Sequence, residues 1–284
     1  MKSVGELVAA GSAYLARHRV DCPRVACELL ASRLLHCQRL ELFLRDRETP
    51  PEAVVDAWRR GLQRVAAGEP VQYVLGEWEF RRLTLAVDRR ALIPRPETEQ
   101  LVDLVLAAQE LWQRPHPLVV DAGTGSGCIV LSLAAERPHG RYAATDTSAE
   151  ALALARDNAA RCGAAGVEFR QEPGCGAFPA GSVDAVVSNP PYIASGDIPG
   201  LARCIREHEP VAALDGGPDG LDAIRAIARD AAMVLRPAGR LFLEIGDDQG
   251  PAVRELLERL AFVQVDILPD LAGRTRFALA RHGG

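Results

Sequence analysis

The first 68 residues carry apolar side chains at intervals of three and four positions, the spacing that buries one face of a helix. Ser3 and Glu6 have the spacing of a capping box, which predicts the start of a first helix. Asp21 with Pro23 predicts the start of a second helix, and a third stops at Gly68. No catalytic constellation falls in this helical region, so contact with a partner and a purely structural role are both compatible with it.

The pattern changes between Val71 and Val87, where aromatic residues appear and apolar positions alternate with polar ones. This alternation predicts a hairpin or a pair of short strands that connects two domains. Pro94 and Pro96 then exclude regular helix, because each lacks an amide proton and has a fixed φ. A helix resumes at about Glu97.

From residue 118 onward, short apolar runs alternate with helical patterns. The predicted strands cover residues 118–122, 142–146, 167–171, 183–188, 240–245, 262–268 and 275–280. One helix is predicted from about Cys128 to a stop near Pro138, and another over residues 148–161. Such alternation predicts an α/β fold, with a parallel sheet and helices on both faces. We expect a helical domain at 1–72, a β-hairpin connector at 73–91 and an α/β domain at 92–284.

The composition is that of an ordered protein: 48% of the 284 residues are hydrophobic, and the mean hydropathy is near zero. The chain contains no apolar run of about 18 residues, which a membrane helix would need. Its first residues lack the order of regions found in a signal peptide, so we expect a cytoplasmic protein without membrane contact. The net charge of −5 argues against a nucleic-acid binder. The seven cysteines include no C-x-x-C pair, so we expect reduced thiols and no metal.

A glycine-rich segment lies between the strand at 118–122 and the next helix. It reads Val120-Asp121-Ala122-Gly123-Thr124-Gly125-Ser126-Gly127. A phosphate-binding P-loop would need a lysine that the segment lacks, and a dinucleotide site would need a glycine where Cys128 stands. The G-x-G-x-G form, with Asp121 two residues before it, instead fits a cofactor that carries an amine or a cation.

Asp146 ends the next strand, about twenty residues further on, where an acidic residue can accept hydrogen bonds from both hydroxyls of a ribose. Together with the glycine-rich segment, it predicts S-adenosylmethionine, an adenosine joined to a charged amino acid, as the cofactor. The alternative is a tight strand-to-helix turn followed by a solvated Asp146.

The most specific motif follows the strand at 183–188 and reads Asn189-Pro190-Pro191-Tyr192. The prolines fix φ and remove two amide donors, so nearby carbonyl groups face outward as acceptors. Asn189 adds a side-chain carbonyl, and Tyr192 adds a flat ring. This set suits a planar NH₂ group that is held by two acceptors beside a ring. The alternative is a rigid proline turn without chemistry.

A planar NH₂ nitrogen is a poor nucleophile, because its lone pair is delocalised. Accepting its two hydrogens polarises the nitrogen and directs the lone pair toward a methyl group. The sulfonium leaving group supplies the driving force, so positioning and electrostatics carry the catalysis without a strong base.

At this point the chain resembles the release factor glutamine N5-methyltransferase family over nearly its whole length. Besides the helical N-terminal part, the glycine-rich segment, Asp146 and the Asn-Pro-Pro-Tyr motif, the resemblance rests on Leu92-Ile93-Pro94-Arg95-Pro96-Glu97-Thr98-Glu99, His208-Glu209-Pro210, Ala213-Leu214-Asp215-Gly216-Gly217 and Asp219-Gly220-Leu221. The Pro-Arg-Pro-Glu-Thr-Glu run separates this family from the many other methyltransferases that have an Asn/Asp-Pro-Pro-Tyr motif.

The resemblance implies a Rossmann-like, class I S-adenosylmethionine-dependent methyltransferase domain with a seven-stranded, mostly parallel sheet. It implies that the methionine part of the cofactor is lined by Gly123, Thr124, Gly125, Ser126 and Gly127. Asp146 would bind the ribose. The glutamine amide would be held by Asn189, which also touches the cofactor, and by Pro190, with Pro191 beside it and Tyr192 packed on the amide.

The substrate that the resemblance implies is the glutamine of the Gly-Gly-Gln motif in class 1 peptide chain release factors. The helical domain would grip the release factor away from the reacting amide. We expect a monomer that makes no direct contact with nucleic acid.

One departure from the family concerns the adenine. Members often have an acid and an aromatic residue after the strand at 167–171. Here Glu172 can supply the acid, but Pro173 stands where the aromatic is expected, and Phe178 comes further on.

Three other residues have weaker expected roles. His208 and Glu209 have the chemistry of an acid–base pair, but we expect loop residues that shape the substrate mouth. Arg95 could steer a substrate or anchor a loop.

Two hypotheses compete with methylation of a release factor. Methylation of adenine N6 in DNA or RNA uses the same motif, but it would require a basic face or a recognition insert. A non-catalytic module that retains the fold is the other hypothesis. The presence of Asn189, Tyr192 and Asp146 counts against it. Other protein or small-molecule amides are further possible substrates.

Overall fold

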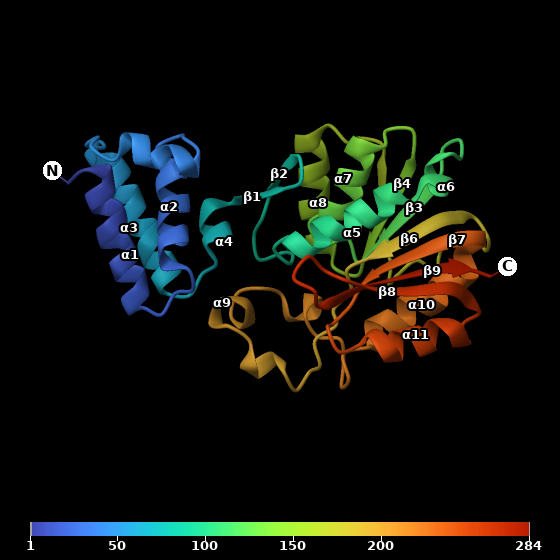
Figure 1. Ribbon diagram of the computed structural model, residues 1–284. Helices are drawn as coiled ribbons and strands as arrows, with labels where there is room; N and C mark the ends of the chain where they lie inside the picture. The colour runs from blue at the N-terminus through green and yellow to red at the C-terminus, as the bar shows by residue number, and fades with distance from the viewer. Residues whose placement is uncertain (1, 284) are drawn as a thin grey trace. The chain divides into compact units, whose positions relative to one another are not determined.

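The computed structural model describes residues 2–283 and divides the chain into two compact units (Figure 1). The first unit comprises the chain up to Glu77 together with Ala202–His208. The second comprises Trp78–Leu201 and the residues from Glu209 onward. The chain therefore returns to the first unit for a short segment in the middle of the second, which the predicted domain boundaries do not include.

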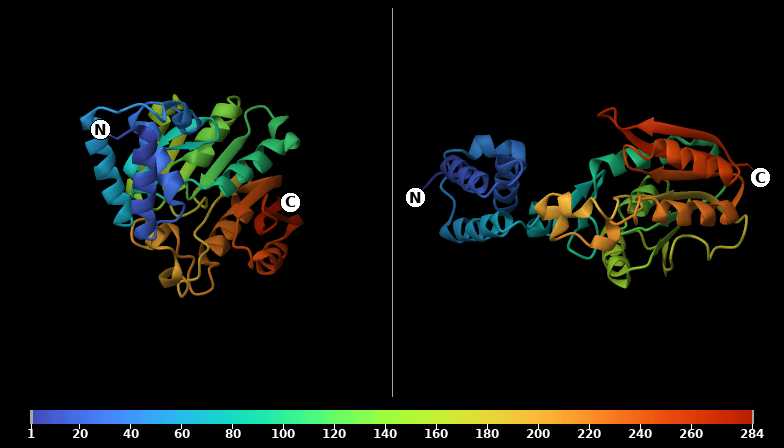
Figure 2. Two further views of the ribbon diagram at one scale, coloured as in Figure 1. Left: turned by 60° about the vertical axis from the view of Figure 1, so that its left-hand side comes forward. Right: turned by 90° about the horizontal axis from the view of Figure 1, so that it is seen from below.

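The first unit is helical. Its elements are α1 (Val4–Arg17), α2 (Pro23–Leu34), the 3₁₀ helix η1 (Arg39–Arg45), α3 (Glu52–Ala66), α4 (Val71–Leu75) and α9 (Arg203–Arg206). The helices α1, α2 and α3 lie side by side in each view (Figures 1 and 2). They bury a core that includes Leu15, Leu30 and Trp58.

The predicted helix starts in this unit are observed, and the one error concerns Val71. The capping box is present, since the Ser3 hydroxyl accepts from the Glu6 amide at 3.3 Å and Glu6 accepts from the Ser3 amide at 2.8 Å. The residue before α2 is Cys22, which has a positive φ and makes no side-chain cap. The strand prediction from Val71 was wrong at its start, because α4 follows Pro70 and ends at Gly76. A five-residue helix is too short to display helical periodicity.

The second unit contains a two-stranded and a seven-stranded sheet. The strands are β1 (Glu77–Phe80), β2 (Leu83–Ala86), β3 (Leu118–Ala122), β4 (Arg141–Asp146), β5 (Val167–Gln171), β6 (Val183–Ser188), β7 (Leu235–Glu244), β8 (Phe262–Pro269) and β9 (Thr275–His282). The helices are α5 (Pro96–Ala107), α6 (Gln109–Trp112), α7 (Cys128–Glu136), α8 (Ala149–Cys162), α10 (Asp222–Val234) and α11 (Gly250–Arg259), with short 3₁₀ turns η2 (Ile198–Gly200) and η3 (Val211–Ala213).

The large sheet has the order β5-β4-β3-β6-β7-β9-β8 and is parallel except at β9, which runs antiparallel between β7 and β8. The chain leaves β3 toward β4 and β5 and then returns to the other side of β3 as β6. In sheets of this kind, ligands bind at the carboxyl ends of the strands where the order reverses. This point lies between β3 and β6.

Alternate strand residues face two separate cores. Val120 and Leu241 belong to the core under α10 and α11, whereas Val119 and Phe242 belong to the core under α5 and α7. Figure 1 shows these helices on the two sides of the sheet. The seven-stranded, mostly parallel sheet predicted from the sequence is confirmed. No helix within residues 2–283 is both long and apolar enough to cross a membrane.

Candidate functional site

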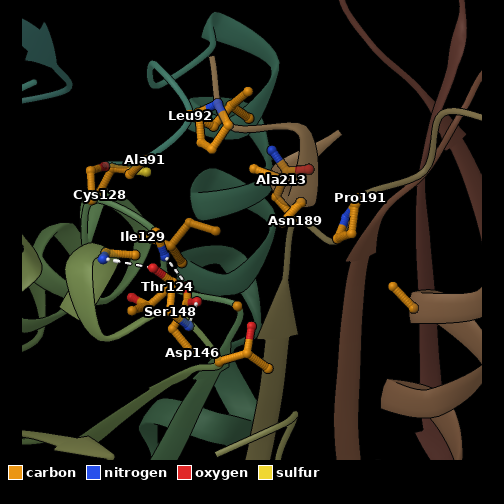
Figure 3. Close-up of a pocket in the computed structure, with 18 of the residues that line it drawn as sticks. Ala91, Leu92, Thr124, Cys128, Ile129, Asp146, Ser148, Asn189, Pro191 and Ala213 are labelled. Atoms are coloured by element: carbon orange, nitrogen blue, oxygen red, sulfur yellow. Dashed lines mark hydrogen bonds between the residues drawn. The ribbon is translucent and has the colours of Figure 1, made fainter. Parts of the chain in front are cut away.

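A cavity of about 370 Å³ opens at the carboxyl ends of β3, β4, β5 and β6 (Figure 3). Of the residues that the sequence put forward, those in its lining are Gly123, Thr124, Gly125, Ser126, Asp146, Glu172, Pro173, Asn189 and Pro191. Gly127, Pro190 and Tyr192 are not in the lining. Further lining comes from residues 90–95, from Thr98 on α5 and from the α10 residues Ala223, Ala226 and Ile227. Four strand ends therefore meet at one site.

The glycine turn, residues 123–127, is shaped by backbone hydrogen bonds to β4. The amides of Gly123 and Thr124 both donate to the carbonyl of Thr145, each at 2.9 Å. Gly123 and Gly125 have φ of 75° and 55°, a region that glycine adopts without strain. A side chain on Gly123 would meet no atom within 4 Å, so it would occupy the space in front of the turn.

Gly127 serves packing rather than the cavity. A Cβ atom there would lie 3.0 Å from the Leu131 side chain and 3.3 Å from that of Ala155. The missing side chain therefore leaves room for Leu131 of α7 and Ala155 of α8 next to the turn.

Asp146 is half-buried at the end of β4, and its carboxylate is already engaged on both oxygens. One oxygen accepts from the Gly125 amide and the other from the Ser148 amide, each at 2.9 Å. Each carboxylate oxygen has two lone pairs, so both oxygens can accept one further hydrogen bond. Asp146 can thus shape the glycine turn and still bind two hydroxyl groups.

Asp121 lies under the glycine turn and is fully buried, outside the cavity lining. One of its oxygens accepts from the Thr124 hydroxyl at 2.7 Å and from the Val130 amide at 3.3 Å. The other has no hydrogen-bond partner in the described structure. Burial raises the pKa of Asp121 to about 7, and these hydrogen bonds oppose the rise.

Asn189 and Pro191 bring the Asn-Pro-Pro-Tyr turn, residues 189–192, to the cavity at the end of β6 (Figure 3). The side-chain amide of Asn189 donates from Nδ2 to the hydroxyl of Thr98 at 2.9 Å. Pro190 is buried.

Tyr192 packs its ring against the core under α10 and α11, and its hydroxyl donates to Glu244 at 3.2 Å. The guanidinium of Arg276 on β9 donates to the same hydroxyl at 3.4 Å and lies 5.7 Å from the ring centre. Burial raises the pKa of the Tyr192 hydroxyl, so it stays protonated and able to donate.

Glu244 ends β7 and is almost completely buried. Its second oxygen accepts from the Thr98 hydroxyl at 2.7 Å. Burial raises the pKa of Glu244 to about 7, while Thr98, Arg276 and Tyr192 stabilise the carboxylate and limit the rise.

The loop after the turn is held by the side chain of Gln249. Its Nε2 donates to the carbonyls of Tyr192 at 2.9 Å and Gly220 at 3.1 Å, and its Oε1 accepts from the Gly246 amide at 2.8 Å. One buried amide thereby connects three loops at this end of the sheet.

Arg95 and Glu209 form an ion pair at 2.5 Å, and Glu209 also accepts from the Ile93 amide at 3.2 Å. Glu209 is buried, so this pair anchors the 90–95 segment of the cavity lining. His208 belongs to the other unit. The structure thus favours loop anchoring among the roles considered for Arg95.

Glu172 and Pro173 line the cavity beyond β5, where an adenine is expected. Phe178 is buried in the core, with the Arg170 guanidinium 4.2 Å from its ring centre, and does not line the cavity. Pro173 and Ile227 are among the apolar residues of the cavity lining.

Sequence reasoning missed Thr98, Glu244 and Gln249 as parts of the site. Thr98 lies inside the Pro-Arg-Pro-Glu-Thr-Glu run, which served only to recognise the family. Glu244 carries the same signal as Asp146, a charged residue at the end of an apolar strand. Gln249 has no comparable signal.

The residues present fit S-adenosylmethionine. The glycine turn leaves open space where a side chain would project, Asp146 has free acceptor capacity for a ribose, and much of the cavity lining is apolar. Among residues 2–283, no group of three or more His, Cys, Asp and Glu side chains could hold a metal ion.

The fold and the match of residues 104–203 to the methyltransferase small domain identify a methyltransferase. Residues 6–76 match a second family, the PrmC N-terminal domain. The chain is 44% identical over 280 residues to "Release factor glutamine methyltransferase" of Cereibacter sphaeroides, covering 98% of this chain and 95% of that protein. It belongs to the release factor glutamine methyltransferase family.

Other relatives of the same name have similar identity. The protein of Moorella thermoacetica is 43% identical (94% of each chain covered), and that of Deinococcus radiodurans is 40% identical (98% of each covered). Among solved structures, the hMettl16 catalytic domain in complex with the MAT2A 3′UTR hairpin 1 has a TM-score of 0.56 at 16% identity, covering 81% of this chain and 80% of that chain. A methyltransferase from Pyrococcus furiosus has a TM-score of 0.50 at 17% identity, covering 78% and 98%. These two likenesses concern the fold alone.

Proposed function

We propose that this protein transfers a methyl group from S-adenosylmethionine to the side-chain amide nitrogen, N5, of the glutamine in the Gly-Gly-Gln motif of class 1 release factors. The observation that carries the proposal is the position of Asn189, an amide acceptor in the wall of the cavity that also contains the glycine turn and Asp146. The names of the relatives support the same substrate.

The cofactor would be held by residues from three strand ends. Gly123, Thr124, Gly125 and Ser126 would contact its methionine part, Asp146 its ribose hydroxyls, and Glu172 with Pro173 its adenine. When bound, S-adenosylmethionine supplies an electrophilic methyl group on a sulfonium. Gly127 would contribute indirectly, because the space that a side chain would need is taken by Leu131 of α7 and Ala155 of α8.

The glutamine NH₂ group would donate to two acceptors, the side-chain carbonyl of Asn189 and the backbone carbonyl of Pro190. Both hydrogens would then be fixed in the amide plane, which leaves the nitrogen lone pair directed at the methyl group. Pro191 would bound the amide on the cavity side. Tyr192 would limit movement of the turn, because its ring is packed and its hydroxyl is bonded.

Preorganised acceptors of this kind cost no rearrangement during the reaction, so we attribute most of the rate to them and to alignment. No strong base is needed for the proton lost from the nitrogen, because an amide that carries both hydrogens and the new methyl group is a strong acid and gives its proton to water. The helical unit is proposed to bind the release factor at a distance from the reacting glutamine.

The experiment that tests this proposal incubates the protein with methyl-labelled S-adenosylmethionine and a class 1 release factor. The matched control substrate is the release factor with Gln→Ala in its Gly-Gly-Gln motif, and duplex oligonucleotides are offered in parallel. We expect label only in the unmodified release factor, at glutamine N5 by mass spectrometry. Label in the oligonucleotides but never in the release factor would instead favour adenine methylation.

A further inference from the structure

The hydrogen bonds behind Asn189 have a fixed direction. A carboxylate can only accept, so Glu244 commits the proton of the Thr98 hydroxyl to itself at 2.7 Å. The Thr98 oxygen then has only lone pairs to offer, and it receives the NH₂ group of Asn189 at 2.9 Å. The direction of the first bond therefore decides which end of the Asn189 amide can face Thr98.

Water cannot readily replace these partners. Thr98 is 2% exposed and Glu244 is 1% exposed, so each would be left with an unpaired buried polar group if the hydrogen bond between them were lost. Hydrogen bonds in such surroundings are stronger and more costly to lose than those at the surface. The chain from Glu244 through Thr98 is thus rigid enough to hold an orientation.

The same carboxylate also reaches the other end of the motif. Its second oxygen accepts from the Tyr192 hydroxyl at 3.2 Å. Asn189 and Tyr192 are the first and last residues of the Asn-Pro-Pro-Tyr turn, so one buried side chain on β7 is bonded, directly or through Thr98, to both. The turn is held from behind as a unit.

We propose that Thr98 and Glu244 are positioning residues that orient the Asn189 amide with its carbonyl oxygen toward the cavity. This inference rests on the proposed function, because the orientation matters only where a substrate NH₂ group must be accepted. An amide turned by 180° would present its own NH₂ group to the substrate NH₂ group. Two donors would then face each other, and the substrate amide would lose its acceptor.

Protonation of Glu244 should reverse the direction of the hydrogen bonds that run from Asn189 through Thr98 to Glu244. A neutral carboxyl can donate to Thr98, which frees the Thr98 proton to point at Asn189 and favours the turned amide. The groups that face Glu244 are Thr98 and Glu97 on α5, Cys128 on α7, Tyr192 after β6 and Arg276 on β9. Burial raises the pKa of Glu244 to about 7, while Thr98, Arg276 and Tyr192 limit the rise. We therefore expect kcat to fall as the pH is lowered through this range.

The test compares Thr98→Val, which removes the hydroxyl at nearly constant volume, with Thr98→Ser, which keeps it. Ser132→Ala on α7 is the matched control, because it removes another buried hydroxyl from the same unit. For Thr98→Val we expect kcat to fall by about 10- to 100-fold, while KM for the release factor and Kd for the cofactor change by less than about threefold. Thr98→Ser should recover most of kcat, and Ser132→Ala should retain it.

The pH profile gives a readout that a loss of packing would not produce. The acidic decline of kcat should be present in the unsubstituted protein and absent in Thr98→Val, where Glu244 still titrates but has no connection to Asn189. Glu244→Gln, which cannot titrate, should also lack the decline. If Thr98→Val does not fold, the pH profile of kcat for Glu244→Gln tests the proposal by itself. A decline that persists in these variants would overturn the proposal.

A spectroscopic measurement separates this inference from the proposed function. The side-chain NH₂ signals of Asn189, assigned by their loss in Asn189→Ala, should shift in Thr98→Val without any substrate present. If the unsubstituted protein methylates no release factor but the signals shift, the proposed substrate is wrong and the hydrogen-bond chain stands. Active protein in which Thr98→Val leaves both kcat and these signals unchanged would overturn the positioning role.

Discussion

The glycine turn and the Asn-Pro-Pro-Tyr turn follow adjacent strands, β3 and β6, and face the same cavity, yet they are held by different kinds of contact. The glycine turn is fixed by Asp121, Thr145 and Asp146, all within about 25 residues of it. The Asn-Pro-Pro-Tyr turn is fixed by Thr98, 91 residues before Asn189, and by Glu244 and Gln249, 52 and 57 residues after Tyr192.

This difference in how the turns are held separates cofactor binding from turnover. A turn that is fixed by its own neighbours keeps its shape as long as β3 and β4 pair, so cofactor binding depends on local structure. A turn that is fixed by α5, β7 and the loop before α11 depends on the finished sheet. Changes around the second turn should therefore affect turnover before they affect cofactor binding.

The sharpest test of this separation is Asn189→Ala. Removing the acceptor in the cavity wall should lower kcat by about 1,000-fold, the scale for loss of one preorganised polar group at a reacting centre. The cofactor dissociation constant should change by less than about fivefold, because the glycine turn and Asp146 are untouched. Methyl-transfer assays and titration calorimetry measure the two effects. A variant unable to bind cofactor would show that the turns are not independent.

Each turn is held by a buried acid, Asp121 for the glycine turn and Glu244 for the Asn-Pro-Pro-Tyr turn. Both acids should make the free energy of unfolding depend on pH in the same direction. The pKa values of Asp121 and Glu244 are raised by burial to about 7, above their values in an unfolded chain. Each contribution is therefore complete at pH below about 4 and is lost as the pH rises through about 7. The free energy of unfolding should decrease between pH 5 and pH 8.

Asp121→Asn tests this directly, because the amide oxygen can still accept from Thr124 and Val130. The variant should lack part of the decrease, roughly 3 kcal/mol for a shift of this size. Urea unfolding of both proteins at pH 5 and pH 8 measures the difference. Equal slopes against pH would mean that Asp121 is already ionised in the folded protein at pH 5.

Asp146→Ala should show the reverse of Asn189→Ala. Cofactor affinity should fall by about 30-fold, because the ribose acceptors are lost and the Gly125 amide loses its partner. At saturating cofactor, kcat should recover to within about threefold, since the Asn-Pro-Pro-Tyr turn makes no contact with Asp146 among the hydrogen bonds described. An unchanged dissociation constant would refute the role proposed for Asp146.

The smallest expected effect is at Ser148, whose hydroxyl caps α8 by accepting from the Ala151 amide at 3.1 Å. Ser148→Ala should lower the free energy of unfolding by about 1 kcal/mol, the usual cost of a lost N-cap. Activity at saturating cofactor should be unchanged. Thermal melting with and without cofactor measures the cost, and a large loss of kcat would contradict a local role.

The same contrast explains how much could be predicted from the sequence. Six of the seven strands of the large sheet were placed within two residues at each end, because apolar runs bounded by polar residues report burial directly. The strand predicted at 240–245 begins five residues earlier, as β7 (Leu235–Glu244). Asp146 and Asn189 were found because each ends such a run. The order of strands around β9 and the start of α4 were not predicted, since they depend on pairing at a distance and on a helix of five residues.

The sequence did not predict the roles of Thr98, Glu244 and Gln249, because their hydrogen-bond partners are 91, 146 and 57 residues away in the chain. Nothing in their immediate sequence states which strand end they will meet. Gly127 and Tyr192 were recognised as important, but the structure places both outside the cavity lining, in packing positions. Motifs therefore predicted which residues lie near the strand ends more reliably than which of them line the cavity.

The short segment Ala202–His208 belongs to the helical unit, and this has a consequence for recombination between related genes. Its Arg203 guanidinium lies within 3.4 Å of the position that a Cβ on Gly68 would occupy. A recombination event that exchanged only the 5′ part of the gene would replace one side of this contact and leave the other behind. Functional chimaeras should therefore require two coordinated crossovers, so the two units are expected to be inherited together rather than as interchangeable cassettes.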